Sequence, residues 1–108
     1  MEGVQIASHQ NADSLLEYGF TNHHSPTLYL YKALGSNISF NMSVNKNTKE
    51  INIDVLDENF LQPYDYQYLI LIDKHNQAAK RVKKKVEDIL NSLQEDGVIT
   101  GYKSGMYI

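Results

Sequence analysis

The stretch from Gln77 to Val98, "QAAKRVKKKVEDILNSLQEDGV", is the clearest secondary-structure signal in the sequence. Its apolar residues recur at alternating spacings of three and four, which places them on one face of an α-helix. They are Ala79, Val82, Val86, Ile89 and Leu93, and Leu90 widens the stripe. Gly97 can adopt the left-handed conformation that ends a helix, and Val98 can then contact Leu93. We therefore expect a long amphipathic helix whose apolar face covers another layer of structure.

Three segments upstream of this helix have the pattern of strands, namely Thr27 to Leu34, Asn37 to Val44 and Glu50 to Leu56. The middle segment alternates most cleanly, because its apolar residues fall at every second position. These apolar residues are Ile38, Phe40, Met42 and Val44. The connections "GSN" and "NKNTK" are short and turn-forming, so neighbouring strands must be antiparallel. The pattern predicts a β-meander with one apolar face and one polar face.

The two ends of the chain complete the predicted fold. Near the N-terminus, "NADSLLEYGF" predicts a short helix that is capped by Asn11 or Asp13 and ends at Gly19. After the long helix, "VITGYKSGMYI" predicts one strand, a Ser104-Gly105 turn and a short extended piece. The predicted class is α+β, with an antiparallel β-meander of three to five strands, one long amphipathic helix packed on the sheet and a short N-terminal helix. A chain of 108 residues without repeats or a linker should form a single compact domain over residues 1–108.

The stretch from Phe60 to Asp73, "FLQPYDYQYLILID", admits two structures. As a strand, it would place its three alternating tyrosines on one face, with Pro63 at the entrance, where a missing N–H costs little. As a helix, Pro63 at the first position and Asp65 in the first turn would be favourable, but apolar residues would cover every side. We expect the strand and keep the helix as the alternative.

Tyrosines supply the candidate interaction surface. Exposed aromatic rings on a sheet can form a platform on which bases or sugars stack. The alternative is that the rings pack in the core, because tyrosine is a favourable strand residue. No glycine-aromatic signature of an RNA-recognition sheet accompanies these residues. The candidate surface consists of Tyr29, Tyr31, Tyr64, Tyr66 and Tyr68.

A basic block provides an alternative surface. Residues 74–85 carry six basic and no acidic side chains, whereas residues 1–73 carry three basic and nine acidic ones. Such a block could attract nucleic acid through its phosphates. A solvated helix face is the ordinary alternative, and a single arginine gives little means of reading guanine. The candidate nucleic-acid contacts are Lys80, Arg81, Lys83, Lys84 and Lys85.

A metal site is the third candidate. His23 and His24 could bind one zinc or iron ion together with Asp57, but adjacent residues converge only if they lie in a turn. None of the usual helical metal spacings is present. Acidic residues near a strand end, such as Asp57, are also a common way to solubilise a loop. We therefore predict no metal and keep a metal-dependent enzyme as a distant alternative.

Composition and missing motifs limit the function. The sequence has no cysteine, which excludes disulfides and thiolate zinc sites. It shows no secretory signal and no run of about 20 apolar residues, so we expect a cytoplasmic protein without a membrane partner. Nine lysines against one arginine are typical of AT-rich coding sequences and favour a low-GC bacterium or a phage as the source.

No phosphate loop, nucleophile elbow or dinucleotide fingerprint is present, so we expect no cofactor and favour a protein that is not an enzyme. The expected function is a non-catalytic protein-interaction or self-associating module, whose partner is another protein or a second copy in a dimer. A nucleic-acid-associated accessory protein that uses the basic helix 74–85 is the alternative.

Overall fold

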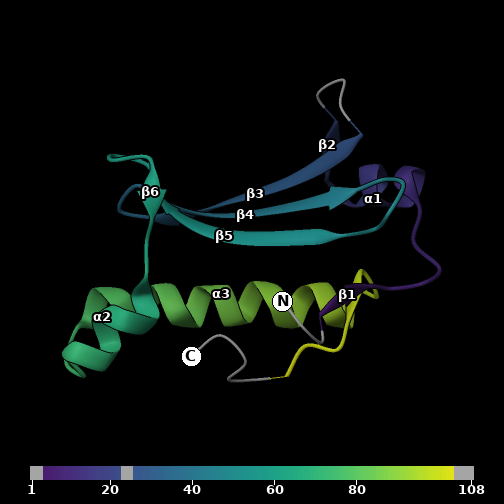
Figure 1. Cartoon of the computed structure of the whole chain (residues 1–108). Helices are drawn as coiled ribbons and strands as arrows, with labels where there is room; N and C mark the ends of the chain where they lie inside the picture. The colour runs from purple at the N-terminus through teal and green to yellow at the C-terminus, as the bar shows by residue number, and fades with distance from the viewer. Residues whose placement is uncertain (1–3, 23–25, 104–108) are drawn as a thin grey trace.

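A computed structural model describes residues 4–22 and 26–103 of the chain. A five-stranded antiparallel sheet lies over the long helix α3 (Gln77–Glu95), as Figure 1 shows. The strands follow one another in sequence order across the sheet: β2 (Thr21–Asn22), β3 (Thr27–Gly35), β4 (Ile38–Asn45), β5 (Ile51–Asp57) and β6 (Gln62–Pro63). This order is the predicted β-meander, and the α+β class is confirmed.

The apolar alternation of β4 fixes which face of the strand is buried. The inward-facing side chains of this strand are all buried, namely Ile38, Phe40, Met42 and Val44. Met42 pairs with Leu30 of β3 and with Ile53 of β5, so apolar residues lie side by side on the covered face. A slip by one residue would turn every one of them toward the other face. The burial of this face therefore excludes a slip by one residue.

Helix α3 ends where its sequence predicts. The N–H of Val98 donates to the carbonyl of Leu93 at 2.9 Å, and the N–H of Gly97 donates to the carbonyl of Gln94 at 3.1 Å. These are the two hydrogen bonds of a Schellman motif. Gly97 has a φ of 76°, a conformation that side chains with a Cβ rarely adopt. The predicted helix stop is therefore confirmed.

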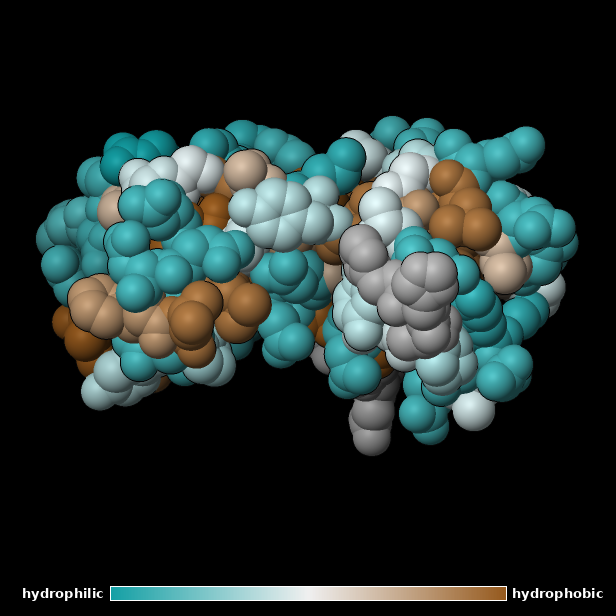
Figure 2. Space-filling view, turned by 90° about the horizontal axis from the view of Figure 1, so that it is seen from above, coloured by the Kyte–Doolittle hydropathy of each residue, from teal (hydrophilic) through white to brown (hydrophobic). Residues whose placement is uncertain are grey.

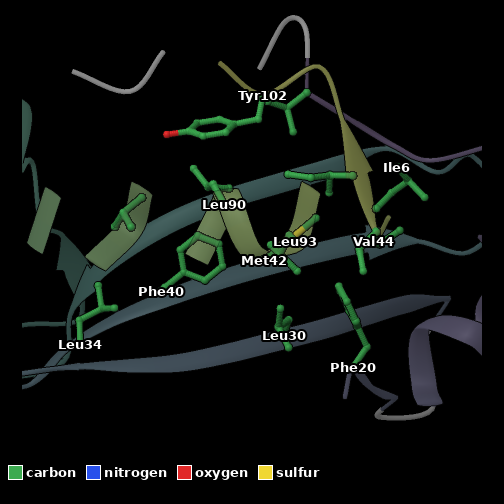
Figure 3. Close-up of a cluster of buried hydrophobic side chains, with 14 of the residues drawn as sticks. Ile6, Phe20, Leu30, Leu34, Phe40, Met42, Val44, Leu90, Leu93 and Tyr102 are labelled. Atoms are coloured by element: carbon green, nitrogen blue, oxygen red, sulfur yellow. The ribbon is translucent and has the colours of Figure 1, made fainter. Parts of the chain in front are cut away.

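The sheet and α3 meet in a buried cluster, part of which Figure 3 shows. Phe40 and Met42 of β4, together with Leu90 and Leu93 of α3, are at most 2% exposed. Burying one apolar side chain of this size stabilises a protein by roughly 1.5–3 kcal/mol. This cluster is therefore the main contact that holds the helix against the sheet.

Helix α1 (Ala12–Tyr18) has the predicted start and end. The side chain of Asn11 accepts a hydrogen bond from the N–H of Ser14 at 2.9 Å, and the Ser14 hydroxyl accepts one from the N–H of Asn11. Of the two candidate caps, Asn11 is therefore the one used, and Gly19 follows the last turn. Leu15 is buried and anchors the helix to the core.

The segment after α3 forms the expected strand, β7 (Ile99–Thr100). It pairs with β1 (Gln5–Ile6) in a separate two-stranded antiparallel sheet, and the sequence did not predict that partner. The Ser104-Gly105 turn and the final extended piece lie outside the described residues. In residues 4–22 and 26–103, no helix combines the length and the apolar character that crossing a bilayer requires.

The expectation of a strand over residues 63–73 is wrong, because this segment contains the helix α2 (Tyr66–Ile72). Asp65 caps the helix, since its Oδ1 accepts a hydrogen bond from the N–H of Tyr68 at 3.0 Å. A strand here would need a pairing partner, whereas a helix satisfies its own backbone and can pack on α3. The helix alternative also needs correction, because Pro63 lies in β6 and not in the first helical turn.

Candidate interaction surfaces

Helix α2 exposes three large apolar side chains on seven residues. Leu71 is 81% exposed, Ile72 is 62% exposed and Tyr68 is 56% exposed. We call these three residues the α2 surface. Figure 2 shows apolar surface at the end of the molecule that carries α2. Exposed apolar patches of this kind often mark places where proteins associate.

The turn between β5 and β6 adds two more exposed apolar side chains, Phe60 and Leu61. Together with the α2 surface, they make five of the nine large hydrophobic residues that are exposed in the described part of the chain. All five come from the 14 residues of the stretch 60–73. This one stretch therefore carries most of the unburied large apolar side chains.

The five tyrosines of the predicted surface do not lie on one face. Tyr66 is buried in the core at 6% exposure, and Tyr64 is partly buried against the core. Tyr68 belongs to the α2 surface. Tyr29 and Tyr31 lie on β3, on the sheet face opposite α3, and are 42% and 58% exposed. The structure therefore separates these residues into a core group, the α2 surface and a pair on the open sheet face.

The open face of the sheet is polar beside these two tyrosines. Tyr31 pairs with Asn41 of β4, which in turn pairs with Asp54 of β5. Nearby, Ser39 is fully buried, donates a hydrogen bond to Glu58 at 2.5 Å and accepts one from Asn41 at 2.9 Å. This network satisfies the one polar side chain that is buried on this face in the described residues.

The candidate nucleic-acid residues lie on α3 and differ in their exposure and in their bonding partners. Lys80, Arg81 and Lys84 are exposed, whereas Lys83 is partly buried. Lys84 forms an ion pair with Asp88 at 3.3 Å. The remaining candidate, Lys85, donates a hydrogen bond at 2.8 Å to the carbonyl of Leu34 in β3. Nucleic-acid binding through this helix stays a prediction.

Burial and the acidic residues of α3 raise the pKa of the Tyr102 side chain. Burial raises the pKa of this phenol, and the negative charges of Glu87 and Asp88 raise it further. The backbone of Tyr102 is held by Gln94, whose side chain accepts from its N–H at 2.8 Å and donates to its carbonyl at 3.0 Å. The middle of α3 therefore presents negative as well as positive charge.

The metal alternative is only partly within the described residues. His23 and His24 lie outside them, and Asp57 is a partly buried residue whose carboxylate accepts a hydrogen bond from the N–H of Asn59 at 3.0 Å. Among the residues that are described, no three histidine, aspartate or glutamate side chains gather as a ligand group. A metal site with these residues stays a prediction.

Comparison with known proteins gives one structural relative. No family model matches the sequence, and no curated protein matches it. The chain is similar to the crystal structure of a DUF1831 family protein from Lactobacillus plantarum, with a TM-score of 0.67 and 16% sequence identity over 90% of this chain and 84% of that one. The likeness is one of fold. The DUF1831 protein therefore supports the α+β architecture and assigns no activity to this chain.

The candidate surface predicted from the sequence consisted of tyrosines only and left out Leu71 and Ile72, because residues 63–73 were expected to form a strand. It also left out Phe60 and Leu61, which precede that segment. One signal was available, since a helix that is apolar on all sides cannot bury every residue in a two-layer fold. Only three side chains of α2 face the core, namely Tyr66, Leu69 and Ile70. The remaining large apolar residues of the helix are consequently exposed.

Proposed function

We propose that this chain is a small, non-catalytic interaction domain that self-associates through the α2 surface. The observation that carries the proposal is the exposure of Tyr68, Leu71 and Ile72 on one seven-residue helix. A single helix of this length is marginal in water, so its contacts with α3 hold it in place. An ordered helix that displays apolar side chains is a suitable element for an interface.

The surroundings of α2 suit an interface of ordinary composition. A stable homodimer buries roughly 800 Å² on each partner, which is more than three side chains provide. A hollow beside α2 is lined by Ile70 together with Lys80, Lys83 and Lys84 of α3. The aliphatic stems of lysines can cover apolar surface while their charges stay in water. Such lysines would form the polar rim around the apolar centre.

Sedimentation velocity over a range of protein concentrations tests the proposal. We expect the wild type to form a dimer, and we expect Leu71→Ser and Ile72→Ser to shift it toward the monomer. Leu16→Ser is the matched control, because Leu16 is also an exposed leucine, at 40%, but lies on α1. A wild type that stays monomeric at every concentration, or a dimer that Leu71→Ser leaves unchanged, would contradict self-association through α2.

A further inference from the structure

Strand β5 has a hydrogen-bonding edge that the sheet leaves open. The short strand β6 pairs only with the last two residues of β5. Just before these, the carbonyl of Val55 accepts a hydrogen bond from the N–H of Tyr64 at 2.8 Å. From Ile51 to Asp54, the outer side of β5 is paired with no other strand in the described part of the chain. An unpaired edge of this kind is a template for one more strand.

The backbone groups of Ile51 and Ile53 point toward this open edge. The carbonyl of Glu50 accepts from the N–H of Asn45 at 2.9 Å, so Glu50 directs its carbonyl toward β4. Backbone groups alternate between the two sides along an antiparallel strand. Ile51, Ile53 and Val55 therefore face outward, as the bond from Tyr64 to Val55 shows. Within residues 4–22 and 26–103, Ile51 and Ile53 have no backbone partner on that side.

Two hollows lie end to end along the same edge. The first is lined by Ile51 and Asn52 on one side and by Val4 and Ile6 on the other. The second continues from Ile53 to the segment between β6 and α2. Its lining includes Tyr64 and Val86. The open edge of β5 therefore lines both hollows, which we together call the groove, and apolar residues belong to the lining of each.

The acidic side chains along the groove favour a basic partner. Glu50 lines the first hollow, and Asp54 and Asp65 line the second. Lys49 is the one cation among the lining residues, and its ammonium group lies 3.4 Å from the carbonyl of Ser8. The side chains of Ile51 and Ile53 are partly buried beside the core. A complementary strand would carry apolar residues on one face and basic residues on the other.

We propose that the open edge of β5 binds an extended basic peptide segment of a partner protein. The peptide adds a strand beside β5 and hydrogen-bonds to the backbone of Ile51 and Ile53. Its apolar residues pack on the core side of the groove, and its lysines or arginines lie near Asp54 and Glu50. This is β-strand addition, in which the backbone supplies affinity and alternate side chains supply specificity.

A second copy of this chain fits the edge less well than a separate peptide does. Residues Val4 and Ile6 line the far side of the first hollow, so they would obstruct a whole subunit that approached β5. In a two-fold pairing of β5 with itself, Glu50 and Asp54 of both copies would also lie along one interface. Like charges across paired strands are destabilising. The edge proposal is therefore independent of self-association through α2.

A synthetic peptide in which valine alternates with lysine and threonine is the probe. Its binding to the full chain is measured by fluorescence anisotropy, and the backbone contacts are located by hydrogen exchange at the amides of Ile51 and Ile53. We expect saturable binding and slower exchange at both amides. A peptide with glutamate in place of lysine should bind at least about tenfold more weakly, because it faces Glu50 and Asp54.

Ile53→Pro tests the edge in the protein. Proline removes the outward N–H of residue 53 and leaves the ladder to β4 intact, as edge strands tolerate. We expect about tenfold weaker binding, the loss that follows from one backbone hydrogen bond. Asp54→Lys should also weaken binding, whereas Glu17→Lys on α1 is the matched charge control. If Ile53→Pro does not fold, an N-methylated probe tests the same contacts on the wild type. A probe that is N-methylated on its edge-facing amides should fail to bind.

The outcomes separate the two proposals. Absence of probe binding at high concentration, or binding that N-methylation leaves unchanged, would overturn peptide addition at β5. Amides of Ile51 and Ile53 that become protected in the protein alone as its concentration rises would show that a second copy occupies the edge, which also overturns it. Leu71→Ser should abolish self-association and leave probe binding intact, so either proposal can fail without the other.

Discussion

The hydroxyl of Tyr18 donates a hydrogen bond of 2.7 Å to the carboxylate of Asp96 and thereby joins the end of α1 to the end of α3. Burial, the hydrogen bond to Asp96 and the charge of Asp96 raise the pKa of Tyr18 to about 12. The phenol is therefore neutral at physiological pH and acts as a donor. Because Tyr18 is 38% exposed, solvent screens the contact and its contribution to stability is small.

Alkaline pH should weaken this contact. The pKa of Tyr18 is raised above its ordinary value of 10.0, so the stability that it contributes is complete below about pH 10 and is lost as the pH rises toward about 12. We expect Tyr18→Phe to lose less stability than the wild type across this range, as followed by urea unfolding at several pH values. Ultraviolet titrations of the wild type and of Tyr18→Phe differ by the one phenol of Tyr18. If that phenol ionised near pH 10, the result would contradict the raised pKa.

Replacing Gly97 should destabilise the end of α3. Gly97→Ala places a Cβ on a residue with a φ of 76°, which costs roughly 1–2 kcal/mol. The nearest atom to that Cβ is Nε2 of His9 at 3.5 Å, so backbone strain and not a clash causes the loss. Thermal unfolding followed by circular dichroism measures the change. Ser92→Ala, at an exposed position of the same helix, should stay within about 0.5 kcal/mol of the wild type.

Shortening Leu90 should have the largest effect on stability. Leu90 is fully buried between α3 and the sheet, so Leu90→Ala removes apolar contacts and leaves a cavity. We expect a loss of about 2–5 kcal/mol in the free energy of unfolding. Denaturant unfolding provides the measurement, and Leu16→Ala is the exposed leucine for comparison. Equal effects of the two substitutions would show that Leu90 is not in the core.

The hydrogen bond between Asp65 and the N–H of Tyr68 should keep helix α2 ordered and thereby hold the α2 surface in place. Asp65→Ala removes the acceptor for the N–H of Tyr68, a loss of about 1 kcal/mol that falls on a helix of seven residues. We expect faster hydrogen exchange in residues 66–72 and weaker self-association, with the exchange of α3 unchanged. Asp65→Asn retains an acceptor oxygen and should behave like the wild type. Faster exchange throughout the chain would instead indicate a global effect.

The nucleic-acid alternative predicts that binding to the basic helix depends on salt concentration. If Lys80 and Lys84 bind phosphates, affinity for single-stranded DNA should fall steeply between low and physiological salt. Lys80→Glu and Lys84→Glu should each weaken that binding, whereas Lys103→Glu changes the net charge equally outside the basic block. Binding that does not depend on salt would rule out the nucleic-acid alternative.

Much of the fold followed from local patterns in the sequence. The alternation from Ile38 to Val44 predicted β4 and its buried face, because each side chain in a strand has one of only two directions. The cap at Asn11 and the stop at Gly97 predicted the ends of helices from the chemistry of single residues. The candidate surface was less predictable, since exposure depends on what another element covers.

Periodic patterns in the sequence predicted the long helix, the meander and the buried face of β4. The strand register came from packing in three dimensions, because a shift by two residues would leave the same side chains buried. The conformation of residues 66–72 did not follow from the local pattern, since an apolar run of this length is compatible with a strand and with a helix. Packing against α3 selected the helix, buried Tyr66 and left Leu71 and Ile72 exposed. The tertiary structure also decided that β6 ends early and leaves the outer edge of β5 open, because strand pairing depends on where distant segments lie in space.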